Sequence, residues 1–173
     1  MTDPQLRQLL DREAIRDCLY LYCRGIDRAD EAALRASYWP DATDDHGPYK
    51  GSASGFIDMA MPRLRRAERS IHEVHNVLIA FEDDGQCARV ESQFSAFQRE
   101  PDANGTMTQW DMKGRYLDRF TKRGDEWRVQ SRVVVFDWAE LMPLPPGTEA
   151  ERFGGRTPIG GRFPDDPLYA FLE

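Results

Sequence analysis

The feature of this sequence that most restricts its fold is a change in hydrophobic periodicity near residue 70. Before it, apolar residues recur every three or four positions, as on one face of a helix: Ile15, Leu19, Tyr22 and Ile26. After it, runs rich in β-branched and aromatic residues are separated by turn-like stretches such as EDDG and KRGD. Helices first and strands afterwards predict an α+β domain, in which helices cover one concave face of a twisted sheet.

Local signals divide the first half into three helices. Asp3 and Pro4 begin a long first helix, because Asp can accept a hydrogen bond from a free amide and Pro fits the first turn. Asp30 caps a second helix, EAALRASYW, which Pro40 ends. A third helix covers SGFIDMAMPRLRRA, with Pro62 bending or dividing it.

Four antiparallel strands in a meander are the simplest interpretation of the second half: IHEVHNVLIAF, QCARVESQFSAF, TMTQWDMKGRYLDRFT and EWRVQSRVVVFDW. We predict one domain over residues 1–140 and an irregular extension, 141–173, that is rich in Pro and Gly. Six apolar side chains indicate that the extension packs over its own sheet or onto a neighbouring subunit: Phe153, Phe163, Leu168, Tyr169, Phe171 and Leu172.

Composition argues against several classes of protein. A chain of 173 residues with 40% hydrophobic residues can enclose a core and a ligand-sized cavity. Its net charge of -7 disfavours nucleic acid as a partner, and the arginine cluster at positions 63–69 is interpreted as a solvated helix face. No export signal is found, and no apolar run approaches the roughly 20 residues of a membrane-crossing helix. Three cysteines without C-x-x-C spacing indicate reduced thiols, so we expect a cytoplasmic protein.

Two of the three histidines lie in the segment RSIHEVHN, at the start of the first predicted strand. Because side chains alternate between the faces of a strand, His72 and Asn76 share one face and His75 points to the other. A metal site built from both histidines is therefore disfavoured, and no bound metal is expected.

A catalytic role for His72 requires a partner, and Asp27 is the candidate. On helical spacing, Tyr20, Cys23 and Asp27 form a row beside the buried stripe of the first helix. An acid next to the core is costly to desolvate unless a group such as an imidazole pairs with it. An ordinary helix-end Asp exposed to water is the alternative that these residues leave open.

Other polar residues could also contact a ligand. Asn76 could bind one or anchor a neighbouring strand. His46, in DATDDHGPYKG, lies at a pocket mouth or hard-cation site, or in a turn whose Asp side chains cap backbone amides. Tyr20 and Tyr22 could serve a leaving group, or be core residues with tethered hydroxyls.

From about residue 8 to 140 the chain resembles the SnoaL-like branch of the nuclear transport factor 2-like superfamily. The matching segments are DREAIRDCLYLYCRGIDRAD, YWPDATDDHGPYKG, IHEVHNVLI and GRYLDRFTKRGDEWRVQSRVVVFDW. Scytalone dehydratase, hexachlorocyclohexane dehydrochlorinase and the beta subunits of ring-hydroxylating dioxygenases share this fold. The resemblance implies a cone-shaped α+β domain, with a curved mixed or antiparallel sheet covered by N-terminal helices.

The resemblance also implies roles for individual residues. In the dehydrochlorinase and dehydratase members, an Asp at the end of the first helix orients a His that removes a proton from carbon. Asp27 and His72 match these positions. Arg132, in SRVVVFDW, matches the Arg that assists the leaving group in the dehydrochlorinase, although a salt bridge at the sheet edge or between subunits is the alternative. The second catalytic His of scytalone dehydratase has no clear match, which leaves the substrate open.

These observations favour a cofactor-independent lyase, or an isomerase, that acts on a small, largely apolar cyclic molecule. His72 would abstract a proton, Asp27 would orient it, and Arg132 with Tyr22 would stabilise the departing group or enolate. Three further side chains would contact the substrate: Tyr20, Asn76 and His46. The alternative is a non-catalytic binding or assembly subunit similar to the dioxygenase beta subunits. Because relatives associate through the sheet, the resemblance implies a homodimer or homotrimer.

Overall fold

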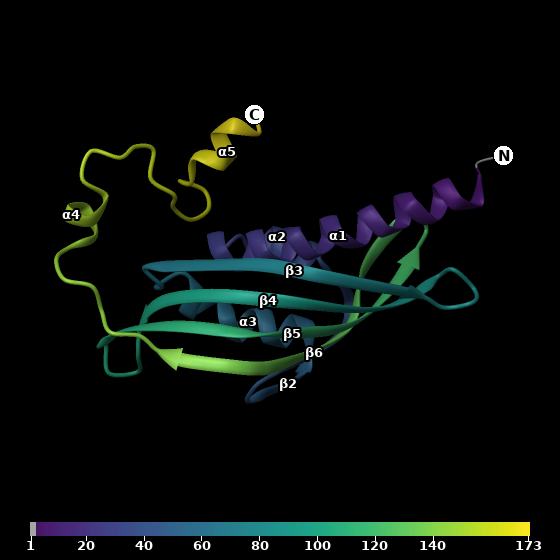
Figure 1. Ribbon diagram of the computed structural model, residues 1–173, viewed down its shortest axis with the longest axis horizontal. Helices are drawn as coiled ribbons and strands as arrows, with labels where there is room; N and C mark the ends of the chain where they lie inside the picture. The colour runs from purple at the N-terminus through teal and green to yellow at the C-terminus, as the bar shows by residue number, and fades with distance from the viewer. Residues whose placement is uncertain (1–2) are drawn as a thin grey trace.

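The computed structural model describes residues 3–173, and in it the four long strands follow three helices, as the periodicity predicts (Figure 1). The elements in chain order are α1 Pro4–Arg28, α2 Glu31–Ala36, β1 Tyr38–His46, β2 Tyr49–Ser52, α3 Ala53–Leu64, β3 Arg69–Phe81, β4 Cys87–Pro101, β5 Met107–Arg123, β6 Glu126–Leu141, α4 Glu149–Phe153 and α5 Pro167–Phe171. The strands form one sheet in the order β2-β1-β6-β5-β4-β3. Neighbouring strands run antiparallel except β1 and β6, which are parallel, so the sheet is mixed.

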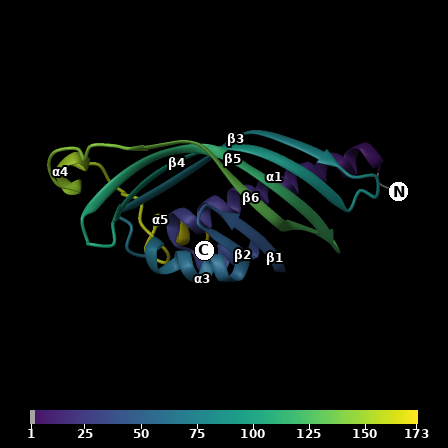
Figure 2. The same ribbon diagram turned by 90° about the horizontal axis from the view of Figure 1, so that it is seen from below.

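The sheet is strongly curved, and the helices lie on its concave side. In Figure 2 the long strands arch over α1 and α3. The predicted stripe of α1 is buried between helix and sheet: Ile15, Leu19, Tyr22 and Ile26. The predicted α+β class, with helices covering a concave sheet, is confirmed. No helix within residues 3–173 has both the length and the apolar character needed to cross a bilayer.

The helix caps follow the sequence signals, but one helix is shorter than expected. Asp3 and Asp30 each accept a hydrogen bond of 3.0 Å from a backbone amide in the first turn of α1 and α2. The second helix ends at Ala36, however, and Pro40 lies inside β1, where the pairing with β6 is irregular. Strands β1 and β2 were not predicted, because aspartates and Pro are uncommon in strands. Pro62 lies in the last turn of α3, which continues to Leu64.

Strand β3 carries a bulge at Asn76. The register with β4 shifts between His75 and Leu78, so Asn76 and Val77 lie opposite a single residue of β4. Asn76 has a φ of 44°, in the left-handed region that Asn tolerates better than most residues. After the bulge, the residues that pack toward the core are Val77, Ile79 and Phe81.

The extension, residues 141–173, turns back from the end of β6 toward the helices (Figure 1). The Phe163 amide donates a hydrogen bond of 2.7 Å to the Arg28 carbonyl at the end of α1. The Tyr169 hydroxyl donates one of 2.9 Å to Asp30, the N-cap of α2. These bonds connect the extension to the helices near Asp27, and Arg69, at the start of β3, donates a hydrogen bond of 3.0 Å to the Gly160 carbonyl.

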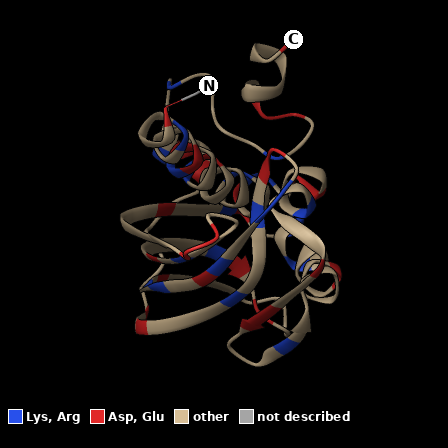
Figure 3. Cartoon of the chain, turned by 90° about the vertical axis from the view of Figure 1, so that its right-hand side faces the viewer, with Lys and Arg blue, Asp and Glu red and all other residues tan. Residues whose placement is uncertain are grey.

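Basic and acidic side chains are interspersed along the described chain (Figure 3). Members of the arginine cluster at positions 63–69 lie next to carboxylates: Arg63 to Glu100 at 3.4 Å, Arg65 to Glu31 at 2.9 Å and Arg69 to Glu149 at 2.7 Å. Three arginines of the cluster are therefore in ion pairs with carboxylates.

Candidate active site

Asp27 and His72 form a buried carboxylate–imidazole pair. Asp27 Oδ1, from the last turn of α1, lies 2.7 Å from His72 Nδ1, near the start of β3. Both side chains are only 8% exposed. The carboxylate also accepts hydrogen bonds from the His72 amide at 2.8 Å and from Ser70 Oγ at 3.1 Å. With Nδ1–H directed at the carboxylate, a neutral ring carries its lone pair on Nε2. The contact that the sequence left open is present.

His72 borders a cavity of about 320 Å³ on the concave side of the sheet. This size suits a small molecule. Most of its wall is apolar or aromatic, contributed by α3 and by the strands β4, β5 and β6: Phe56, Met59, Phe94, Met112, Tyr116 and Phe136. The polar side chains in the wall are His46, Arg63, His72 and Gln98. An apolar wall with a few polar groups can bind a mostly apolar molecule and fix its orientation.

His46 lies in the wall of the same cavity, at the end of β1. Its ring stacks on Phe56, with centroids 4.4 Å apart and planes 17° apart. Its Nδ1 lies 3.3 Å from Oδ1 of the buried Asp44. The residue is therefore part of a strand and of the cavity wall, and not of the Asp-rich turn considered as its alternative.

Arg132 and Tyr22, which we expected near the leaving group, lie in the core next to the cavity. The Arg132 guanidinium is fully buried and forms two hydrogen bonds of 2.7 Å with Asp118. Its central carbon lies 4.1 Å from the ring centroids of both Tyr22 and Tyr116, in cation–π contact. Burial raises the pKa of the Tyr22 hydroxyl. Of these four residues, Tyr116 alone lines the cavity.

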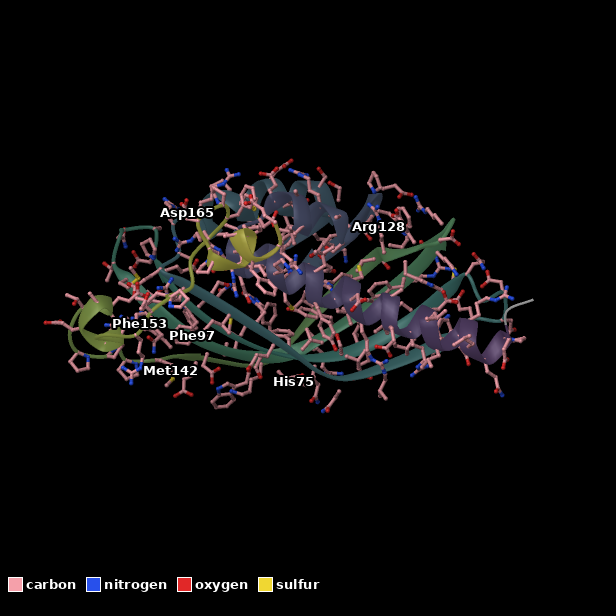
Figure 4. All side chains as sticks on the ribbon, turned by 90° about the horizontal axis from the view of Figure 1, so that it is seen from above. His75, Phe97, Arg128, Met142, Phe153 and Asp165 are labelled. Atoms are coloured by element: carbon pink, nitrogen blue, oxygen red, sulfur yellow. The ribbon has the colours of Figure 1, made fainter. Side chains whose placement is uncertain are left out.

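Tyr20 and Asn76 are not part of this site. Tyr20 is 50% exposed on the outer side of α1. Asn76 was expected on the face of His72, but the bulge reverses the alternation of β3, and the Asn76 amide donates to the Gln93 side chain instead. His75 points outward as expected, along the outer edge of the arched sheet in Figure 4.

The cysteines and the metal-binding side chains do not form a second reactive site. Cys18, Cys23 and Cys87 are free thiols. Burial raises the pKa of both Cys18 and Cys23 to about 12, so their thiols stay protonated at neutral pH. Among residues 3–173, no group of three His, Cys, Asp or Glu side chains is arranged to hold a metal ion.

Sequence reasoning missed Ser70 and Asp44, the hydrogen-bonding and charged neighbours of the two cavity histidines. The signal for Ser70 is strand alternation, since it precedes His72 by two positions in β3. The same signal applies to Asp44, two positions before His46, once the segment is known to be a strand.

Comparison with known proteins identifies the family. Residues 7–133 match the SnoaL-like domain. Hexachlorocyclohexane dehydrochlorinase LinA type 2 is 19% identical, with a TM-score of 0.72 over 83% of this chain and 99% of that chain. A candidate scytalone dehydratase from Novosphingobium aromaticivorans is 17% identical, with a TM-score of 0.71 over 89% of this chain and 99% of that chain.

The beta subunit of a candidate aromatic-ring-hydroxylating dioxygenase from the same organism is 19% identical, with a TM-score of 0.57 over 76% of this chain and 92% of that chain. No curated protein matches the sequence. The TM-scores of these three structures show that they share the fold of this chain. The family match covers most of the chain. The chain therefore belongs to the SnoaL-like domain family.

Proposed function

We propose that this protein is a cofactor-independent lyase that catalyses an elimination on a small, largely apolar cyclic molecule. His72 is the general base, and Asp27 is the residue that positions it. The observation that carries the proposal is the buried 2.7 Å contact between Asp27 and His72 at the wall of an apolar cavity.

The chemistry suits these two side chains. Imidazole gains and loses a proton near neutral pH, and a carboxylate on Nδ1 fixes the tautomer and stabilises the imidazolium that forms. His72 Nε2 would take a proton from a carbon next to a carbonyl or to a leaving group. General base catalysis of this kind typically contributes on the order of 100- to 10,000-fold in rate.

Two of the similar structures support elimination over isomerisation. One is a dehydrochlorinase and the other a candidate dehydratase, and both names describe the loss of a small molecule from the substrate. The apolar wall supports a substrate that is mostly hydrocarbon, and its aromatic side chains favour a ring.

In this proposal Arg132 and Tyr22 act through Tyr116 and do not contact the substrate. Their packing against the Tyr116 ring holds one wall of the cavity in place. This role replaces the direct contact with a leaving group that the sequence resemblance implies for both residues.

The test is turnover of a panel of cyclic hydroxy ketones, followed by the ultraviolet absorbance of the conjugated product. We expect His72→Gln to lower kcat by about 100- to 10,000-fold, because the base is removed. Tyr20→Phe, on the outer side of α1, is the matched control and should retain the wild-type rate. Turnover that survives in His72→Gln would rule out His72 as the base.

A second candidate function is that of a non-catalytic assembly subunit, and one observation supports it. A cross-strand row on the outer face of the sheet presents three exposed apolar side chains beside Glu91: Leu78, Leu117 and Val133. Such a row favours association through the sheet. Binding of the panel without turnover, together with a dimeric or trimeric mass that Leu117→Glu abolishes in light scattering, would favour this function.

A further inference from the structure

A ring nitrogen of His46, which lines the cavity, faces a buried oxygen of Asp44. Asp44 Oδ1 and His46 Nδ1 lie 3.3 Å apart, and neither has an aligned hydrogen bond to any residue in the described chain. The other carboxylate oxygen of Asp44 accepts a hydrogen bond of 2.6 Å from the Tyr38 hydroxyl. A buried carboxylate oxygen without a donor is costly, so a small rotation of the imidazole that directs Nδ1–H at Asp44 is favourable.

The opposite edge of the His46 ring is available to a ligand. His46 lines the cavity, and its Nε2 has no hydrogen-bond partner among residues 3–173. Stacking on Phe56 holds the plane of the ring. His46 therefore repeats the arrangement of His72: Nδ1 faces a buried carboxylate, and Nε2 remains free for a bound molecule.

The two histidines reach the cavity from well-separated strands of the sheet. His46 belongs to β1 and His72 to β3, and strands β6, β5 and β4 lie between them. Side chains from these central strands form the wall between the histidines: Phe94, Met112, Tyr116 and Phe136. A ring bound against this wall would have one imidazole on each side.

We infer that His46, oriented by Asp44, is the general acid of the same site, and that the substrate is a cyclic compound with a hydroxyl group β to a carbonyl. This inference rests on the proposed function and narrows it to dehydration. A halide leaves without a proton, whereas hydroxide is a poor leaving group that needs one. A second imidazole across an apolar cavity supplies that proton.

The step balances as follows for the two residues and the substrate. His72 Nε2 takes the proton from the carbon next to the carbonyl, and the electrons of that C–H bond form the new C=C bond. The C–O bond breaks, and its oxygen takes the proton from protonated His46 Nε2, which releases water. Solvent then removes the proton from His72 and returns one to His46, so the net reaction is loss of one water from the alcohol.

The experiment separates proton removal from loss of the hydroxyl group. Cyclic β-hydroxy ketones are incubated in D₂O with wild type, His46→Gln and His72→Gln, and proton NMR follows both deuterium exchange at carbon and alkene formation. We expect His46→Gln to keep exchange within a few-fold while elimination falls by about 100-fold or more. His72→Gln should lose both, and His75→Gln, on the outer face, should lose neither.

The results distinguish a failure of the His46 inference from a failure of the proposed function. If His46→Gln eliminates water at the wild-type rate, or loses exchange as completely as elimination, the role of His46 is overturned while that of His72 stands. If wild type neither exchanges nor eliminates, the proposed function fails, and the His46 inference fails with it.

A second variant tests the orientation of His46 independently of turnover. In nitrogen-15 histidine NMR we expect Asp44→Asn to change the His46 Nδ1 and Nε2 signals and to leave those of His72 unchanged. Unchanged His46 signals in Asp44→Asn would show that Asp44 does not orient the ring, and would overturn that part of the inference.

Discussion

The two strongest carboxylate pairs in the core differ in what lies beside them. In the Asp27–His72 pair, His72 borders the cavity and one nitrogen of its imidazole remains free for a ligand, while Asp27 contacts the other nitrogen. The side chains of Asp118 and Arg132 have no exposed surface, the guanidinium packs against Tyr22 and Tyr116, and because it stays charged it cannot act as a base. The first pair can move a proton and the second can only hold structure. A buried charge thus acquires a chemical role where a cavity reaches it.

The largest expected effect comes from breaking the Asp118–Arg132 pair. Arg132→Met leaves Asp118 buried without a counter-charge, so we expect the free energy of unfolding to fall by about 3–5 kcal/mol in urea titrations. Replacing both partners, with Arg132→Met and Asp118→Leu together, should recover most of that loss. A loss below about 1 kcal/mol in the single variant would show that water or another group reaches Asp118.

Asp27→Asn should have the opposite pattern of effects, with a small loss of stability and a large loss of activity. An amide in place of the carboxylate no longer matches the three donors around it, so unfolding should become easier by about 1–2 kcal/mol. The rate of elimination should fall by about 100-fold or more, because the His72 tautomer is no longer fixed. Urea titration and turnover of the hydroxy ketone panel measure the two effects. A stability loss as large as that of Arg132→Met would contradict the comparison.

Asn76 belongs to neither pair, so its variants provide a reference for the stability and activity effects of the two pairs. Its φ of 44° favours Asn or Gly, so Asn76→Ala should cost about 1 kcal/mol in the free energy of unfolding, and Asn76→Gly should cost less. Neither variant should change kcat, because the side chain points away from the cavity. A drop in kcat would mean that the bulge positions His72.

The smallest effect concerns Cys23, which lies between the two pairs and feels the charges of both Asp27 and Arg132. Because burial raises the pKa of Cys18 and Cys23 to about 12, both thiols are protonated at pH 8 and shielded from reagents. We expect iodoacetamide to label the partly exposed Cys87 first, as measured by mass spectrometry. Because the Asp27 charge raises the pKa of Cys23 and the Arg132 charge lowers it, faster labelling of Cys23 in Asp27→Asn than in Arg132→Met would sharpen the comparison further.

The sequence predicted the three N-terminal helices and the four long strands from their local signals, but it did not predict the two short helices α4 and α5, which lie in the segment expected to be irregular. It did not predict β1 and β2, whose aspartates and Pro resemble a loop. The parallel pairing of β1 with β6 joins segments about ninety residues apart and leaves no local signal.

Within the site, alternation along β3 separated His72 from His75, and helical spacing placed Asp27 beside the core. The same rule failed at Asn76, because a bulge adds one residue to the count. Arg132 and Tyr22 point into the domain, as predicted. The sequence cannot show whether such a side chain lines the cavity or packs in the solid core. That depends on how the tyrosine rings of different elements fill the space.

The bulge in β3 also determines which changes in chain length this strand can accept. Asn76 is the extra residue, so removing it alone leaves a regular strand in which His72, Val74 and Val77 still alternate inward. Removing a residue elsewhere in the strand, with the bulge kept, would turn one part of the inward set toward solvent. Single-residue gaps among relatives should therefore fall at or beside position 76, and an alignment that places the gap far from the bulge would pair inward residues with outward ones.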